Sequence, residues 1–155
     1  MPTAPEREDQ RLEVLKSLYL WYKEEVFRRR ELMMRLTGFA ATVLVVLLVT
    51  LLIMPVRQRP DSATVLFALT GVALFATIFI FLILQQQNRH RVAKHVLIEI
   101  ERALGLYETG LYTADTTLYP EGWQTAWQAD RSVTIYATVL AALTALVMGA
   151  ILVRL

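Results

Sequence analysis

The sequence predicts an all-α membrane protein with three transmembrane helices, the first two of which extend into the cytoplasm as a helical stalk. Hydrophobic residues make up 55% of the 155 residues, and the mean hydropathy of +0.43 exceeds the usual balance of a soluble domain. Residues 36–56, 62–88 and 132–153 carry no charged side chain. Each run reaches the ~20 residues that a helix needs to cross a ~30 Å hydrocarbon core. Since the polar remainder is too short to cover three buried core helices, all three runs are expected to span a membrane.

The predicted elements follow one another along the chain in a simple order. They are a cytoplasmic amphipathic helix at 6–35 continuous with a first span at 36–56, an external loop at 57–62, a second span at 63–85 continuous with a cytoplasmic helix at 86–104, a cytoplasmic loop at 105–122, an interfacial helix at 123–131 and a third span at 132–153. The external loop is expected to be tight, because Pro55 and Pro60 stop helices and Asp61 or Ser62 can cap the second span.

Basic residues give the expected orientation. Of the 16 Lys and Arg residues, Arg57, Arg59 and Arg154 fall on one side of the membrane, and all others fall on the side shared by the N-terminus and 86–131. Basic segments stay in the cytoplasm, so the N-terminus and residues 86–131 are predicted on the cytoplasmic side of the membrane and the C-terminus on the outside. Because the first 35 residues are polar, no cleavable signal peptide is expected there. The absence of cysteine excludes disulfides and thiolate chemistry.

The two cytoplasmic helices are expected to pack against each other. On the first, apolar side chains recur every three or four residues, and Glu24–Arg28, Glu25–Arg29 and Glu31–Arg35 form favourable i,i+4 pairs. On the second, a stripe of 3.6-residue period runs from Ala93 to Leu104, and Gly105 offers a left-handed cap. Two amphipathic stripes that leave the membrane side by side can bury each other. The residues of the stripes are Leu12, Leu15, Tyr19, Tyr22 and Val26 on the first helix, and Ala93, Val96, Leu97, Ile100, Ala103 and Leu104 on the second.

The 105–122 loop is longer than a typical connector and rich in tyrosine, so we expect it to pack on the stalk rather than to be disordered. Trp123 and Trp127 follow it on the interfacial helix. Paired tryptophans at this point are typical of anchoring at the membrane interface. A ligand-stacking or gating role is the alternative.

Several classes of chemistry lack the residues they need. The spans contain no ionisable side chain, which argues against pumps and secondary transporters. His90 and His95 project about 140° apart around a helix, which suits a surface or headgroup role better than shared metal ligation. No nucleophile elbow or phosphate loop is present. We therefore expect no catalytic residue, no metal and no cofactor, and the protein is predicted not to be an enzyme.

The spans carry two further patterns. Small residues four apart line one face of the third span, which allows close helix approach either within one chain or between subunits; they are Ala137, Ala141, Ala145 and Gly149. Thr70 and Thr77 share a face of the second span. Their hydroxyls are expected to bond back to their own helix, and the alternative is a polar stripe in the pore of an oligomer.

A basic cluster lies at the cytoplasmic edge of the membrane. It comprises Arg28, Arg29, Arg30, Arg89, Arg91 and Lys94. Anionic lipid headgroups explain such a cluster, at about 1 kcal/mol for each basic residue near the surface. A nucleotide or phosphorylated messenger is the alternative ligand, because arginine matches phosphate geometry. No binding of duplex nucleic acid is expected.

The layout resembles that of small multi-span membrane effector proteins of bacterial nucleotide-signalling anti-phage systems. The segments that carry the resemblance are "WYKEEVFRRRELMMR", which runs into the first span, and "RHRVAKHVLIEIERALGLYETGLY", which follows the second. The resemblance is one of layout and assigns no residue a role. It implies a homo-oligomeric channel or membrane-disrupting effector that is gated through its cytoplasmic part. The alternative is a non-conducting accessory or scaffold subunit whose stalk docks a cytosolic protein.

Overall fold

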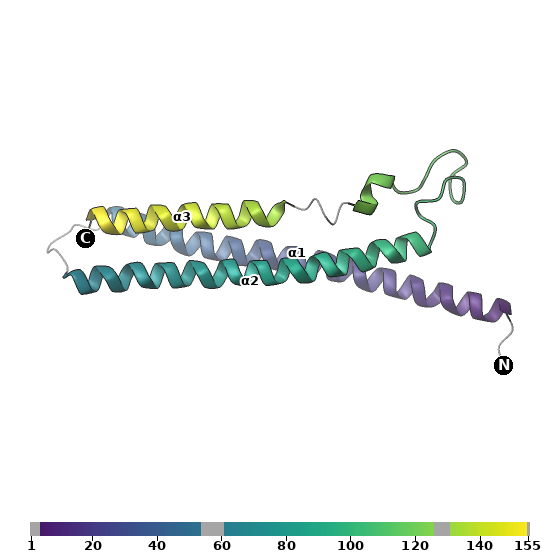
Figure 1. Ribbon diagram of the computed structural model, residues 1–155, viewed down its shortest axis with the longest axis horizontal. Helices are drawn as coiled ribbons and strands as arrows, with labels where there is room; N and C mark the ends of the chain where they lie inside the picture. The colour runs from purple at the N-terminus through teal and green to yellow at the C-terminus, as the bar shows by residue number, and fades with distance from the viewer. Residues whose placement is uncertain (1–3, 54–60, 126–130, 155) are drawn as a thin grey trace. The chain divides into compact units, whose positions relative to one another are not determined.

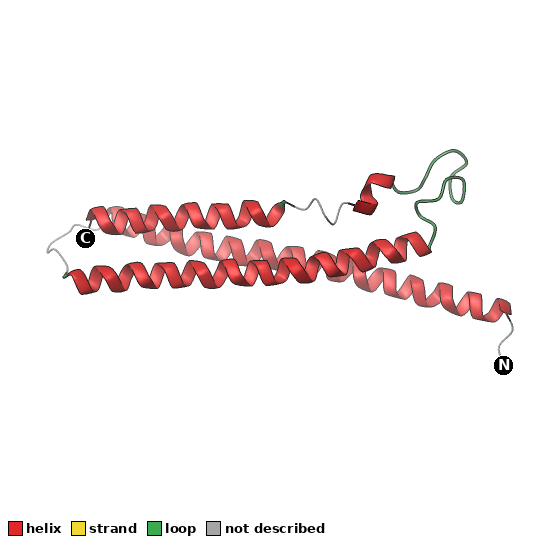
Figure 2. Ribbon diagram, viewed as in Figure 1, coloured by secondary structure: helices red, strands yellow, loops and turns green. Residues whose placement is uncertain are grey.

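The computed structural model describes residues 4–53, 61–125 and 131–154. Along the chain these form α1 (Ala4–Ile53), α2 (Ser62–Ala103), the short 3₁₀ helix η1 (Glu121–Thr125) and α3 (Ser132–Arg154) (Figure 1). The described residues contain no strand (Figure 2). α1, α2 and α3 are each long and apolar enough to cross a membrane. The prediction of an all-α chain with three helices able to span a membrane is therefore confirmed.

α1 is one uninterrupted helix of 50 residues. No glycine or proline stands between Glu6 and Thr37 to break it. Arg28 forms an exposed ion pair with Glu24 at 3.0 Å, and Arg29 forms a largely buried one with Glu25. Pairs of this spacing stabilise a helix by about 0.2 to 0.5 kcal/mol each. The end of the predicted first span, at 54–56, lies outside the described residues.

α2 is defined by a cap at each end. At its start, the backbone N–H of Thr64 donates to Asp61 Oδ1 over 3.2 Å, and the Thr64 hydroxyl donates to the same oxygen. These hydrogen bonds lower the pKa of Asp61. At its end, the N–H of Gly105 donates to Arg102 O and that of Leu106 to Glu101 O, over 3.0 and 3.1 Å. This is a Schellman motif, which needs the left-handed φ of 71° that Gly105 adopts.

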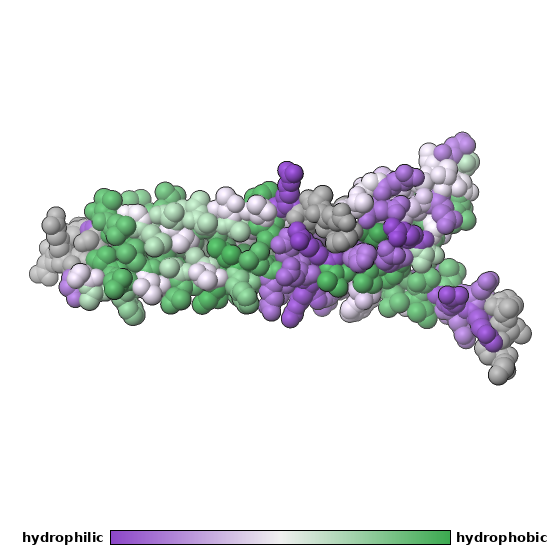
Figure 3. All heavy atoms as spheres, in the orientation of Figure 1, coloured by the Kyte–Doolittle hydropathy of each residue, from purple (hydrophilic) through white to green (hydrophobic). Residues whose placement is uncertain are grey.

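The chain divides into two compact units. The first comprises Met1–Glu31 and Asn88–Asp130, and is called the polar unit below; the second comprises Leu32–Gln87 and Arg131–Leu155, and is called the apolar unit. Hydrophobic side chains cover most of the surface of the apolar unit in the view of Figure 3. α1 and α2 contribute residues to both units.

The apolar unit has a core to which all three long helices contribute. Within each helix its most deeply buried side chains recur at intervals of four, seven or eleven residues, as expected where helices pack lengthwise. They are Met33, Ala40 and Leu44 of α1, Val72 and Ile83 of α2, and Val133, Leu140, Val147 and Ile151 of α3.

In the polar unit, the segment after α2 packs against the helices through its tyrosines. The Tyr119 hydroxyl shares a hydrogen bond of 2.8 Å with that of Tyr19 on α1. The Tyr107 hydroxyl donates to Glu101 Oε2 over 2.6 Å, and both residues are buried. The Tyr112 hydroxyl donates to Leu104 O over 2.7 Å. These contacts confirm the expectation that this loop packs on the helices.

Three expectations on the polar unit require correction. His90 is buried, at 4% exposure, and does not lie at a surface. It continues a buried face of α2 that includes Gln87 and Ala93, so the face begins before the predicted stripe. Conversely, two residues of the predicted stripes are exposed rather than buried. They are Leu12 on α1 and Ala103 on α2.

Candidate functional site

The basic cluster contributes to a pocket in the polar unit. The pocket has a volume of about 400 Å³. α1 and α2 each supply neighbouring turns of one face, which places their side chains around a common space. The lining residues are Trp21, Tyr22, Glu25 and Arg29 of α1, and Asn88, Arg89, Val92 and Ala93 of α2.

The charges of this basic–aromatic pocket do not cancel. Arg29 and Glu25 form an ion pair, and both side chains are largely buried. This pair holds the Arg29 guanidinium in a fixed place. Arg89 is exposed and brings a further positive charge. The pocket therefore attracts anions, and its guanidinium groups suit phosphate or carboxylate oxygens.

The aromatic residues give the pocket an apolar wall. The rings of Trp21 and Tyr22 meet edge to face, with centroids 4.7 Å apart and planes at 90°. Trp21 is 57% exposed, so part of its surface is open to contact. Asn88 adds an amide that can both donate and accept hydrogen bonds. Such a pocket can hold a planar ring beside an anionic group.

The structure brings together Arg29 and Arg89 from the predicted basic cluster, and places the other members outside the pocket. Arg28 is exposed and pairs with Glu24. Arg30 is exposed, and Arg91 and Lys94 are half-buried. The Nε of Arg91 is buried and meets no hydrogen-bond partner in the part of the chain that the structure describes.

Sequence reasoning missed the neutral and acidic part of the pocket. Tyr22 belongs to the predicted packing stripe and Glu25 to a predicted i,i+4 pair, and neither Trp21 nor Asn88 belongs to a predicted site. The available signal was the i, i+4, i+8 register of Trp21, Glu25 and Arg29, which places an aromatic, an acidic and a basic residue on one helix face.

A tyrosine network lies elsewhere in the polar unit. The hydrogen bond with Tyr19, and then burial, raise the pKa of Tyr119 to about 12. Burial and the hydrogen bond to Glu101 raise the pKa of Tyr107 well above its usual range. Both phenols therefore stay protonated near neutral pH and keep their hydrogen bonds. The ring of Trp123 lies on that of Tyr119 with centroids 5.3 Å apart, whereas Trp127 and the rest of 126–130 lie outside the described residues.

In the apolar unit, the small-residue face of α3 points away from the core. Ala141, Ala145 and Gly149 are exposed and Ala137 is half-buried. The core uses the other side of α3, through Val133, Leu140, Val147 and Ile151. Packing within the chain therefore does not use this face as its main contact.

One shallow pocket is lined both by the small-residue face of α3 and by a threonine of the predicted polar stripe on α2. Ala141 and Ala145 line it together with Thr77 of α2, and its volume is about 300 Å³. The hydroxyls of Thr70 and Thr77 donate to Leu66 O and Ala73 O over 2.9 and 2.8 Å. Both threonines bond back to their own helix, as expected.

Among the described residues, no group of His, Cys, Asp or Glu could hold a metal ion. No family model, no curated protein and no solved structure matches this chain.

Proposed function

We propose that the protein is a homo-oligomeric channel or membrane-disrupting effector of the bacterial inner membrane, gated by a soluble anionic ligand. The basic–aromatic pocket of the polar unit carries the proposal. It is built from α1 and α2, and these two helices also provide two of the three candidate spans. A ligand that binds two arrangements of these helices with different affinity would bias one of them.

The chemistry of the pocket favours a nucleotide-like ligand. Arg29 and Arg89 suit phosphate oxygens, and Trp21 offers an aromatic surface on which a base can stack. The polar unit would then be a cytoplasmic stalk that receives the signal, and the spans would be the output. Oligomerisation is supported by the exposed Ala141, Ala145 and Gly149, which leave room for a second helix.

The test is dye efflux from vesicles that contain the purified protein, with and without a panel of mononucleotides and cyclic nucleotides. We expect one class of nucleotide to stimulate efflux. Arg89→Glu should reduce the stimulation at least tenfold, because it reverses a charge in the pocket. Arg30→Glu is the matched control, since Arg30 is exposed and does not line the pocket.

Two outcomes would contradict the gating proposal. The first is an equal loss in both variants, which would indicate general attraction of the basic cluster to lipid headgroups. The second is dye efflux that is the same with and without every nucleotide tested and that is unchanged in Arg89→Glu.

A second candidate is a non-conducting accessory or scaffold subunit. It is favoured by large apolar side chains that the polar unit exposes, such as Leu20 at 66% and Phe27 at 69%. Side chains of this kind can form the centre of a protein interface. Vesicles that remain tight under all conditions, with a cytosolic protein that binds wild type but not Phe27→Ser, would support this candidate.

A further inference from the structure

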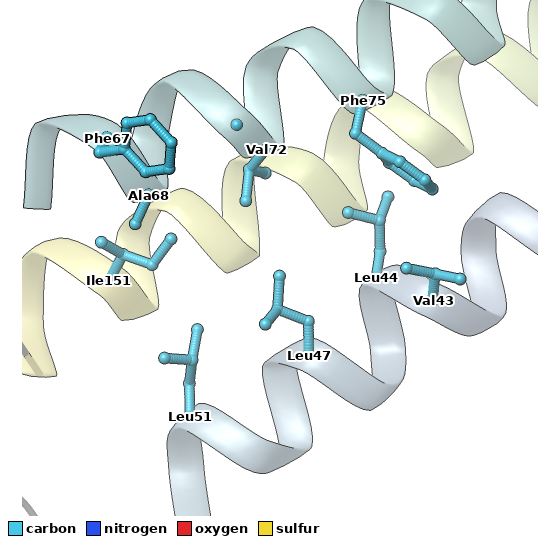
Figure 4. Close-up of a pocket in the computed structure, with 10 residues that line it drawn as sticks. Val43, Leu44, Leu47, Leu51, Phe67, Ala68, Val72, Phe75 and Ile151 are labelled. Carbon is cyan, nitrogen blue, oxygen red and sulfur yellow. The ribbon is translucent and has the colours of Figure 1, made fainter. Parts of the chain in front are cut away.

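The apolar unit contains a pocket that the proposed function does not use. It lies where α1, α2 and α3 approach one another, and its volume is about 370 Å³. Figure 4 shows Leu47 and Leu51 of α1, Phe67 and Phe75 of α2 and Ile151 of α3 turned toward this space. All the residues that line it are apolar. Such a cavity has no partner for water and is expected to be dry.

The pocket is open to its surroundings on the α2 side. Gly71 of α2 lines it, and a Cβ added there would meet nothing within 4 Å. Phe67 is 82% exposed. Since these residues belong to candidate membrane spans, the medium around them is the hydrocarbon of lipid chains. An empty recess would forfeit dispersion contacts along its walls, so an apolar group that enters it is stabilised.

A positive charge stands at one end of this pocket. Arg154 lies one turn beyond Ile151 on α3, and its Nη2 donates to Leu52 O over 2.7 Å. Leu52 directly follows Leu51, which lines the pocket. Leu52 O belongs to the last turn of α1, where helix carbonyls have no partner within the helix. This bond therefore fixes the guanidinium beside the pocket, and a guanidinium has donors in several directions.

The dimensions select a lipid chain over a helix. The α1 residues that line the pocket, from Val43 to Leu51, extend along about 12 Å of the helix axis. A volume of about 370 Å³ over that length gives a cross-section of about 31 Å². A helix with its side chains is at least about 10 Å wide and is too thick to enter. A single extended hydrocarbon chain is not.

We propose that this pocket binds one acyl chain of an anionic glycerophospholipid, with the lipid phosphate at Arg154. The apolar lining takes the chain and the guanidinium takes the phosphate, which pairs well with its planar donors. The pocket thus has the same order of apolar and charged parts as a phospholipid. This inference is independent of any channel activity.

Native mass spectrometry of protein extracted from vesicles of equal parts phosphatidylglycerol and phosphatidylcholine tests the proposal. Wild type should retain phospholipid and prefer phosphatidylglycerol. Gly71→Leu should reduce retention of both lipids at least tenfold, because the new side chain fills the pocket. Arg154→Gln should retain lipid but lose the preference for phosphatidylglycerol.

Gly38→Leu is the matched control, because a Cβ there also meets nothing within 4 Å and Gly38 does not line the pocket. Circular dichroism should show that all variants are folded, since leucine favours helix over glycine. Retention that Gly71→Leu leaves unchanged would overturn the proposal. An equal loss of lipid in Gly38→Leu would also overturn it, as would wild-type protein that carries detergent but no phospholipid. A disulfide crosslink between Phe67→Cys residues of two copies, if it persists in lipid vesicles, would show that a second copy covers the pocket instead.

Discussion

Individual tyrosine hydroxyls hold the segment after α2 in place. Tyr107 is buried and Tyr119 is half-buried, and each hydroxyl shares a hydrogen bond with another side chain. A buried phenol needs such a partner, because leaving its polar atom unpaired costs about 1 to 3 kcal/mol. The tyrosine content of the loop predicted its docking, but the partners Glu101 and Tyr19 could not be predicted. They lie on helices whose rotation about each other depends on the packing of the whole unit.

The pKa of Tyr119 reports the contact with Tyr19. A pKa raised from 10.0 to about 12 favours the protonated phenol in the folded state. Its contribution to stability is therefore complete below pH 10.0 and is lost as the pH rises from there to about 12. We expect Tyr19→Phe to lower the pKa of Tyr119 toward 10.0, because phenylalanine cannot share the hydrogen bond. Tyrosinate absorbance during a pH titration measures this, with Tyr119→Phe as the reference. An unchanged Tyr119 titration in Tyr19→Phe would contradict the expected contact.

At the scale of elements, the sequence predicted what depends on local composition. The long charge-free runs predicted three apolar helices, and Asp61 and Gly105 predicted where α2 begins and ends. His90 could not be placed in this way. Its polarity suggested a surface position, whereas the register of α2 puts it on the buried face with Gln87 and Ala93. Burial of a polar residue depends on the helix packed against it, which one helix pattern does not specify.

The cap at Gly105 predicts the cost of an alanine substitution there, and the same substitution at Gly110 is the control. Gly105 and Gly110 both have positive φ, at 71° and 82°. A Cβ at Gly105 would force the Cδ2 methyl of Leu111 to move, whereas one at Gly110 would meet nothing within 4 Å. Gly110→Ala should therefore cost about 1 kcal/mol from backbone strain alone, and Gly105→Ala should cost more.

Amide hydrogen exchange at Leu106 and Tyr119 measures the difference, because their N–H groups donate to Glu101 O and Leu106 O. A cost of about 1 kcal/mol corresponds to about fivefold faster exchange through local opening. Exchange in Gly105→Ala that is no faster than in Gly110→Ala would show that the Leu111 contact does not constrain this turn.

At the scale of the whole molecule, the sequence predicted which segments are apolar but not which faces meet. From the sequence, the small-residue face of α3 could pack either within the chain or against a second chain. The structure uses Leu140 and Val147 for packing within the chain and leaves Ala141 and Ala145 exposed. Both faces are apolar, so hydropathy could not choose between them. In lipid the choice depends on side-chain shape, because burial against another helix brings little hydrophobic gain.

The exposed face therefore predicts how copies of the chain associate. Ala141→Leu with Ala145→Leu should disrupt an oligomer, because the added volume prevents the close helix approach that small residues allow. Val139→Phe is the control, since Val139 is also exposed on α3 but lies about 160° around the helix from Ala141 and about 120° from Ala145. Crosslinking in membranes should show at least a tenfold loss of oligomer in the double variant and none in the control. A double variant that assembles like wild type would mean that this face contacts lipid, and oligomers would then have to form through other surfaces of the apolar unit.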